Sequence, residues 1–187
     1  MSKKLVRRQT LAYRKLLSEE QYSTRNQSLL TQFLSSEFML SETFHVFLPI
    51  KRNKEVDTWM IVKRLATSNK KIIISSTDFE QNSMSHFWLE KETNIEENEY
   101  GIPEPKQATK ADIEQTDCIL IPLVAWDSLG SRIGYGKGYY DSLIHSIKKS
   151  VIKVGLSLSP GFDSFPFMEE HDQKLDFCVT PFEVIKF

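Results

Sequence analysis

Two kinds of hydrophobic pattern alternate along the chain. Apolar residues recur at helical spacing in four segments, which are residues 3–17, 18–36, 58–67 and 139–149. Short apolar or alternating runs typical of strands separate them; these are residues 44–48, 71–75, 84–89, 118–122, 151–158 and 174–180. Ser18 followed by Gln21 is a capping-box pattern that marks the start of the second helix.

The order of these elements predicts the class of fold. Residues 92–116 are charged and irregular, and residues 125–138 are typical of a loop. Strands that alternate with helices indicate an α/β protein with a mostly parallel sheet covered by helices on both faces. Ligands of such sheets bind beyond the C-terminal ends of the strands. We therefore expect the site near the loop 123–138, which directly follows the strand 118–122.

The composition narrows the class of protein. With 187 residues, 40% of them hydrophobic, the chain suits one domain over residues 1–187. Its 24 Lys and Arg balance 25 Asp and Glu, which disfavours nucleic-acid binding through bulk positive charge. No apolar run approaches the roughly 20 residues that span a bilayer, and the first residues lack a secretory signal. We expect a cytoplasmic monomer with no membrane or nucleic-acid partner.

Four of the seven glycines fall between positions 130 and 138. Gly134, Gly136 and Gly138 would let backbone N–H groups approach an anion, and Arg132 and Lys137 add full positive charges. The segment matches neither the Walker A pattern nor the dinucleotide fingerprint. Its setting after a buried strand favours a polyphosphate site over a flexible glycine-rich turn.

Two carboxylates and two bases elsewhere could complete such a site. Asp141 follows the loop and Asp172 lies in a distant loop, and both could hold Mg²⁺. The residues alone favour simpler roles, in which Asp141 stabilises the N-terminus of a helix and Asp172 is a solvated loop residue. Lys3 and Arg7 lie four apart on one face of the first helix and could bind a polyphosphate. A solvated helix face is the alternative for this pair.

The segment Asp127–Asp141, with the core RIGYGKGYYD, resembles the signature of the 5-formyltetrahydrofolate cyclo-ligase family. Further features agree in order along nearly the whole chain. They are the basic first helix with Lys3 and Arg7, residues 55–58 (EVDT), residues 101–105 (GIPEP), the pair His171 and Asp172, and the pair Leu175 and Asp176.

The resemblance implies a three-layer, Rossmann-like α/β fold with a mostly parallel sheet. It also implies that ATP and Mg²⁺ support the conversion of 5-formyltetrahydrofolate to 5,10-methenyltetrahydrofolate, ADP and phosphate. The residues that would contact ATP are Lys3, Arg7, Arg132, Ile133, Gly134, Tyr135, Gly136, Lys137, Gly138, Tyr139 and Tyr140. Those that would contact folate are Leu48, Ile50, Glu55, Tyr135, Gly136, Lys137, Gly138 and Tyr139. Asp141 and Asp172 would hold Mg²⁺.

The implied chemistry is phosphoryl transfer. The formyl oxygen is a poor leaving group until the γ-phosphoryl group of ATP is transferred to it, after which N10 attacks the carbon and phosphate departs. Arg132 and Lys137 would be the catalytic residues that stabilise charge on the transferring group. Glu55 would orient the pterin, or else serve as a capping carboxylate near Thr58.

Several assignments stay open on the sequence alone. Tyr139 and Tyr140 could stack on folate, or one of them could pack beneath the loop. Lys51, Arg52 and Lys54 could attract a folate polyglutamate tail or form a solvated turn. His45, His86 and His145 are expected at ordinary strand or helix positions. The competing functions are a non-catalytic ATP- or phosphate-binding module and a sugar-phosphate isomerase with a similar sheet.

Overall fold

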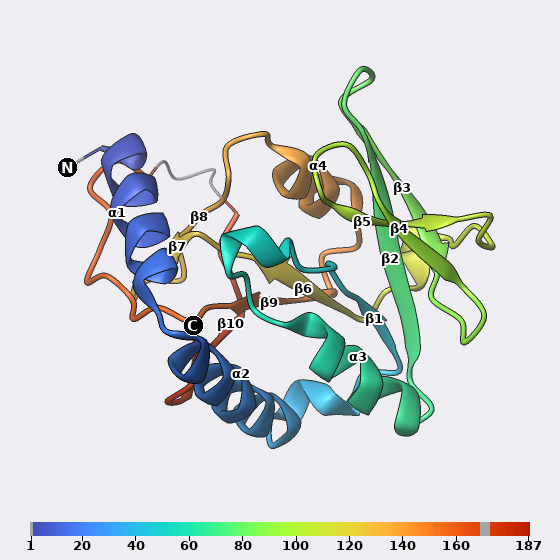
Figure 1. The fold of residues 1–187 in the computed structure, drawn as a ribbon, viewed down its shortest axis with the longest axis horizontal. Helices are drawn as coiled ribbons and strands as arrows, with labels where there is room; N and C mark the ends of the chain where they lie inside the picture. The colour runs from blue at the N-terminus through green and yellow to red at the C-terminus, as the bar shows by residue number, and fades with distance from the viewer. Residues whose placement is uncertain (1, 169–172) are drawn as a thin grey trace.

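The structure, a computed structural model, describes residues 2–168 and 173–187. Within these residues a seven-stranded sheet runs in the order β11-β10-β9-β6-β1-β2-β3 (Figure 1). Its strands are β1 (Thr43–His45), β2 (Lys71–Asp78), β3 (Ser83–Trp88), β6 (Cys118–Pro122), β9 (Ile152–Leu156), β10 (Phe177–Val179) and β11 (Val184–Lys186).

The five inner strands pair in parallel, and β3 and β11 are antiparallel at the two edges. The chain passes from β1 to β2 on one side and later places β6, β9 and β10 on the other side. The strand order therefore reverses between β1 and β6, which is where sheets of this kind bind ligands. The expected α/β class with a mostly parallel sheet is confirmed.

Helices α2 (Glu19–Leu34) and α3 (Thr58–Thr67) cover one face of the sheet, and α4 (Tyr139–Ser146) covers the other (Figure 1). The expected capping box is present, because the Ser18 hydroxyl accepts from Gln21 N–H and the Gln21 side chain accepts from Ser18 N–H. None of the helices within residues 2–168 and 173–187 has the length and apolar character needed to cross a bilayer.

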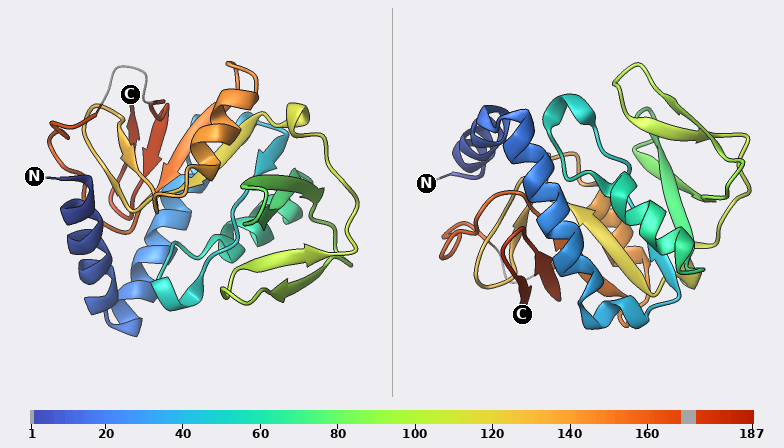
Figure 2. Two further views of the ribbon diagram at one scale, coloured as in Figure 1. Left: turned by 90° about the horizontal axis from the view of Figure 1, so that it is seen from above. Right: turned by 60° about the horizontal axis from the view of Figure 1, so that its bottom comes forward.

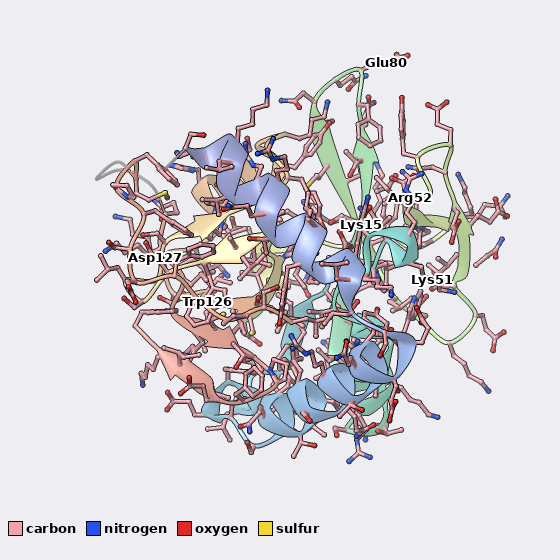
Figure 3. All side chains as sticks on the ribbon, turned by 60° about the vertical axis from the view of Figure 1, so that its left-hand side comes forward. Lys15, Lys51, Arg52, Glu80, Trp126 and Asp127 are labelled. Atoms are coloured by element: carbon pink, nitrogen blue, oxygen red, sulfur yellow. The ribbon has the colours of Figure 1, made fainter. Side chains whose placement is uncertain are left out.

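Helix α1 (Lys3–Leu16) lies across one end of the molecule. Figure 3 shows it passing between Trp126 and Asp127 on one side and Lys51 and Arg52 of the 3₁₀ turn η2 (Lys51–Asn53) on the other. Its buried Val6 packs with Ala125, Ile133 and Phe165 in a small apolar cluster. This cluster positions the helix against the segment that carries the glycine loop.

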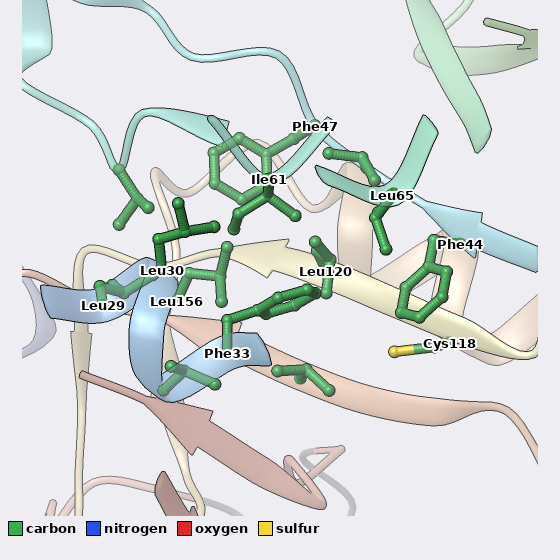
Figure 4. Packing of buried hydrophobic residues seen from close by; sticks show 14 of the residues in the cluster. Leu29, Leu30, Phe33, Phe44, Phe47, Ile61, Leu65, Cys118, Leu120 and Leu156 are labelled. Atoms are coloured by element: carbon green, nitrogen blue, oxygen red, sulfur yellow. The ribbon is translucent and has the colours of Figure 1, made fainter. Parts of the chain in front are cut away.

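The largest core lies between the sheet and the helices α2 and α3 (Figure 4). Leu29, Leu30 and Phe33 of α2 and Ile61 and Leu65 of α3 meet alternate residues of the strands, which are buried with them. On the other face, Leu143 and Ile144 of α4 pack on the next residues along β6, including Ile119 and Ile121. Burial on both faces explains the uninterrupted apolar run in β6.

The structure corrects three expectations about local structure. The charged segment 92–116 contains two paired strands, β4 (Asn94–Glu97) and β5 (Pro103–Lys106), together with the 3₁₀ turn η3 (Ile113–Gln115). The segment 125–138 contains the short strands β7 (Ala125–Trp126) and β8 (Arg132–Ile133), which pair with each other. The expected strand 44–48 ends as a strand at His45, although Val46 N–H still donates to the carbonyl oxygen of Ile73 at 2.8 Å and residues 46–48 remain buried.

The ribbon formed by β4 and β5 was missed because Pro103 and Pro105 argue against a central strand. In a two-stranded ribbon each strand has a free edge, so alternate prolines are tolerated. Glu104 between them is buried, and its Oε1 accepts from Thr77 N–H of β2 at 2.8 Å. This bond joins the ribbon to the hairpin of β2 and β3, and Figure 2 shows the two hairpins side by side in both views.

Candidate functional site

A cavity of about 280 Å³ lies at the C-terminal ends of β1, β2 and β6. Phe47, Leu48 and Ile50 reach it from the segment after β1, and Ile121 and Pro122 reach it from β6. The hairpin of β2 and β3 contributes Ser75, Thr77 and Met84, and the ribbon contributes Ile102 and Pro103. These residues give the cavity an apolar part on the side of the hairpins.

The glycine loop forms another wall of the cavity. Gly136 and Gly138 have φ of 98° and 79°, a left-handed backbone that other residues adopt only with strain. Gly138 is the N-cap of α4, so the positive end of that helix faces the loop. A Cβ at Gly134 or Gly138 would meet no described atom within 4 Å, so the backbone there borders open space.

Helix α1 brings Lys3 and Arg7 to the same cavity. Arg7 Nε donates to the carbonyl oxygen of Gly134 at 2.8 Å, and the guanidinium carbon of Arg7 would lie 3.3 Å from a Cβ at Gly136. Both residues were predicted to contact the polyphosphate. The structure brings them together with the glycine loop, which weakens the alternative of a solvated helix face.

Arg132 and Asp141 form an ion pair at the edge of the cavity. The buried Arg132 donates from Nη2 to Asp141 Oδ1 and from Nη1 to the carbonyl oxygen of Gln173. Asp141 lies in the first turn of α4, with an exposed side chain. Arg132 thus positions the carboxylate beside the glycine loop, while Lys137 is exposed on the loop itself.

Glu55 is a buried carboxylate with 4% of its surface exposed, and it also lines the cavity. Its Oε2 accepts from Ile50 N–H at 2.7 Å, and its carboxyl group accepts from the hydroxyl of Tyr135. The Tyr135 hydroxyl in turn accepts from Arg14 Nη1 at 3.0 Å. A chain of polar contacts therefore joins α1, the glycine loop and the segment after β1.

Burial controls protonation in this group. It raises the pKa of Glu55, an effect opposed by the hydrogen bonds from Tyr135 and Ile50 and by the charge of Arg14. Burial and the Glu55 charge both raise the pKa of Tyr135 and of Tyr140, so both phenols stay neutral. Tyr135 can therefore donate its proton to Glu55 while it accepts from Arg14.

The two consecutive tyrosines lie in different environments. The ring of Tyr139 is half-buried at the cavity and lies 6.0 Å from the ring of Phe79 in the hairpin of β2 and β3. Tyr140 packs between the two main cores, with its ring 6.2 Å from that of His45. Tyr140 is thus the one packed against both cores, while both tyrosines line the cavity.

The predicted metal ligands divide between described and undescribed parts of the chain. Asp172 lies outside the described residues. Within residues 2–168 and 173–187, no three His, Cys, Asp or Glu side chains cluster as a metal site. Asp141 alone still suits Mg²⁺, because this ion is usually held by one or two carboxylates together with phosphate oxygens and water. Its exposed carboxylate beside the anion-binding loop meets that requirement.

Sequence reasoning missed Arg14 and the hairpin residues. Arg14 is 3% exposed, and its Nη2 donates to the carbonyl oxygen of Leu123 at 2.6 Å. The signal was present, since positions 3, 7 and 14 share one helix face with the buried Thr10. Ser75, Thr77 and Met84 carried no such signal, because only the folded sheet brings them to the cavity.

The arrangement is suited to a ligand with two unlike parts. One end offers cations, backbone N–H groups and a helix N-terminus, which suit a polyphosphate. The lining also includes apolar side chains and the carboxylate of Glu55, which suit a ring system with N–H groups. The cavity therefore joins anion binding and ring binding in one space.

Comparisons with known proteins agree with this geometry. The model of the 5-formyltetrahydrofolate cyclo-ligase family matches residues 1–181. A probable 5-formyltetrahydrofolate cyclo-ligase of Schizosaccharomyces pombe is 37% identical over 113 residues, which cover 52% of this chain and 55% of that protein. The 5-formyltetrahydrofolate cyclo-ligase of Escherichia coli K12 is 25% identical over 176 residues, covering 91% of this chain and 96% of that protein.

Solved structures show the same fold. The NMR structure of 5,10-methenyltetrahydrofolate synthetase from Aquifex aeolicus has a TM-score of 0.84 and 30% identity, covering 100% of this chain and 93% of that one. The 5,10-methenyltetrahydrofolate synthetase of Mycoplasma pneumoniae has a TM-score of 0.72 and 21% identity, and its likeness concerns the fold. The match to the fission yeast relative spans little more than half of that protein.

Proposed function

The chain belongs to the 5-formyltetrahydrofolate cyclo-ligase family, and we propose that it converts 5-formyltetrahydrofolate to 5,10-methenyltetrahydrofolate with ATP as co-substrate, releasing ADP and phosphate. One observation carries the proposal: a single cavity is bordered both by the glycine loop with its cations and by the buried carboxylate of Glu55. The names of the relatives supply the substrate class.

The phosphate groups of ATP lie, in this proposal, along the glycine loop between Arg7 and Lys137. The open space at Gly134 and Gly138 lets phosphate oxygens approach the backbone N–H groups. Lys3 and Arg7, which reach the cavity from α1, neutralise negative charge on the triphosphate. The same space is bordered by Ile133, Tyr135, Tyr139 and Tyr140. The γ-phosphoryl group then points toward the apolar part of the cavity.

The folate ring occupies that apolar part, beside Leu48 and Ile50. Glu55 accepts hydrogen bonds from pterin N–H groups, and its orientation is set by Ile50 N–H and the Tyr135 hydroxyl. The half-buried ring of Tyr139 offers a face for stacking. These contacts would place the formyl oxygen near the glycine loop.

The reaction we propose has two steps. The formyl oxygen attacks the γ-phosphorus of ATP and ADP departs, leaving an iminium carbon that bears the phosphate. N10 then attacks this carbon and closes the ring, N10 loses its proton, and the C–O bond breaks as inorganic phosphate leaves. Lys137 and Arg132 stabilise negative charge on the transferring phosphoryl group, and the loop amides share that task.

We propose Asp141 as a ligand of Mg²⁺, with Asp172 as the second carboxylate that the family pattern suggests. The ion, when bound, neutralises charge shared between the phosphate oxygens. Arg132 holds the Asp141 carboxylate in place before any ligand arrives.

A polyglutamate tail on the substrate is a finer proposal. Arg52 donates to the carbonyl oxygen of Tyr100, and Lys54 donates to Leu17 O and pairs with Glu19 at 3.0 Å, so both contribute to holding their segment. Lys51 is exposed on η2, and Lys15 lies on the adjacent α1 (Figure 3). We infer that Lys15 and Lys51, rather than Lys54, would meet a tail of negative charge.

We further infer that residues 1–187 act as one catalytic domain and as a monomer in the cytoplasm. The cavity draws its walls from α1, the central strands and both hairpins, so one copy of the chain supplies them. The buried, unpaired thiols of Cys118 and Cys178 suit a reducing compartment.

The decisive experiment is a spectroscopic turnover assay with ATP and Mg²⁺ omitted in turn. We expect the methenyl product only when 5-formyltetrahydrofolate, ATP and Mg²⁺ are all present. Product without ATP would exclude the phosphorylation step. An ATP-binding protein that forms no product with every component present would instead be the non-catalytic module, and sugar-phosphate turnover without nucleotide would indicate the isomerase.

A further inference from the structure

A chain of hydrogen bonds on the α4 face of the sheet joins two histidines through one serine. His45 Nε2 lies 2.7 Å from Ser75 Oγ, which lies 2.9 Å from His86 Nδ1. The three residues belong to the adjacent strands β1, β2 and β3. Ser75 is paired with His86 in the register of β2 and β3, so their side chains share one face of the sheet. Neither histidine was expected to do more than fill an ordinary strand position.

Burial favours the neutral form of both imidazoles. Burial, with a smaller contribution from the neighbouring His86, lowers the pKa of His45 to about 3. Burial also lowers the pKa of His86. Each ring therefore carries one N–H donor and one nitrogen that can only accept.

The surroundings of His45 decide which of its nitrogens carries the proton. Its Nδ1 is buried and has no hydrogen-bond partner among the residues that the structure describes. Buried N–H groups without a partner are rarer in proteins than acceptors without one. The proton of His45 therefore belongs on Nε2, from which it is donated to Ser75 Oγ.

The Ser75 hydroxyl has one proton and two lone pairs. In the arrangement proposed here, one lone pair accepts from His45 and the proton is donated to His86 Nδ1, so that each bond polarises the next. One lone pair remains, and Ser75 lines the cavity. We propose that Ser75 is a specificity-determining residue whose fixed hydroxyl presents an acceptor to the cavity and selects a ligand with an N–H or O–H donor at that point.

The chemistry of the two ligand parts indicates which one Ser75 meets. A triphosphate at neutral pH offers no donor, so an acceptor is unsuited to it. Ser75 lies on β2 beside Thr77, in the hairpin wall, whereas Arg7 reaches the cavity from α1. Since this inference rests on the proposed function, we assign the donor to an amine or amide N–H of the reduced pterin, and the separate measurement of ATP binding below tests the ribose hydroxyls and adenine amine of ATP as the alternative.

The first test reads the tautomers directly. In a long-range ¹H–¹⁵N spectrum at about pH 8, above the usual histidine pKa of about 6.5, we expect His45 and His86 both as Nε2–H tautomers, assigned with His45→Gln and His86→Gln. His145 is the control, because its Nδ1 lies 2.7 Å from the carbonyl oxygen of Asp141, which can only accept, and must therefore carry a proton. A proton on His86 Nδ1 would free the Ser75 proton for the cavity and overturn the proposal.

The second test measures binding of 5-formyltetrahydrofolate and of ATP separately by calorimetry. We expect Ser75→Ala to bind the folate about three- to tenfold more weakly, the usual effect of one neutral hydrogen bond, with ATP affinity unchanged. Ser75→Thr keeps the hydroxyl on a residue that strands accept and should stay close to the wild type. A folate affinity unchanged in Ser75→Ala, or an equal loss for ATP, would contradict the proposal.

The two proposals fail in different ways. If the wild-type protein binds both ligands and turns over, but Ser75→Ala binds the folate normally, the role of Ser75 is wrong and the proposed function stands. If the wild-type protein does not bind the folate, the proposed function is wrong, and so is the pterin as the donor for Ser75. Circular dichroism of each variant shows whether it has folded.

Discussion

Arg7 Nε donates to the carbonyl oxygen of Gly134 across 127 positions of sequence. The bond attaches the first helix of the chain to the loop that borders the candidate phosphate site. It also uses the flat guanidinium group to cover Gly136, whose backbone has positive φ. The first helix is therefore part of the site, and a change in either partner is expected to affect both ligand binding and docking of the helix.

Lys137→Ala tests the catalytic role of the loop. Lys137 is exposed, so its removal leaves the core intact, while the transferring phosphoryl group loses a full positive charge. We expect turnover to fall by about a hundredfold or more, in the range seen when one such stabilising group is removed, with an unchanged melting temperature. Lys149→Ala, on another exposed lysine just past α4, is the matched control. A normal rate for Lys137→Ala would show that the loop is not the phosphate site.

Gly134→Ala and Gly136→Ala separate ligand access from backbone strain. A methyl group at Gly134 meets open space, so this variant should fold normally but bind ATP more weakly, because the methyl occupies room needed by phosphate. Gly136 has φ of 98° and touches Arg7, so Gly136→Ala should also lower stability by about 1 kcal/mol or more. Thermal melts and ATP titrations measure the two effects. Equal melting temperatures for the two variants would contradict this assignment.

Glu55→Gln tests whether the buried carboxylate makes the stability of the protein depend on pH. Burial raises the folded-state pKa of Glu55 above its ordinary value of 4.5, so the folded state binds the proton more tightly than the unfolded state. This contribution to stability is complete below the unfolded pKa and is lost as pH rises through the folded pKa. The wild type should therefore lose stability relative to Glu55→Gln as the pH rises above 4.5.

The same variant should bind the folate poorly at neutral pH, because the amide puts an NH₂ donor in place of one carboxylate oxygen that the proposed function sets against pterin N–H groups. Denaturant melts at several pH values and folate titrations give the two measurements. A stability difference that does not change with pH would mean that the pKa of Glu55 is not raised. Normal folate binding would remove Glu55 from the site.

Asp141→Asn tests the proposed Mg²⁺ ligand. The amide can still accept from Arg132 but carries no charge for the ion. We expect the variant to need at least about tenfold more Mg²⁺ for half-maximal turnover, with ATP binding in the absence of Mg²⁺ little changed. Titrating Mg²⁺ at fixed ATP gives the comparison, and an unaltered Mg²⁺ requirement would exclude Asp141 as a ligand.

Much of the fold follows from local pattern. The helical spacing of apolar residues, the capping box at Ser18 and the apolar run of β6 depend on neighbours a few positions away, and all three are found as predicted. The glycines at 136 and 138 have the left-handed backbone that only glycine adopts readily. Local chemistry was sufficient there because the cause and its effect lie within one turn of the chain.

The remaining features depend on distant contacts. Pro103 and Pro105 argue against a strand until the ribbon is seen to have a free edge, and Arg14 is one more base until the fold buries it between Leu123 and Tyr135. Ser75, His45 and His86 are separated along the chain and meet only because β1, β2 and β3 are neighbours. The local sequence thus determines the helices, most of the strands and the backbone of the glycine loop. Burial and strand order, which arise from packing the whole chain, decide which polar groups share a cavity and what proton each one carries.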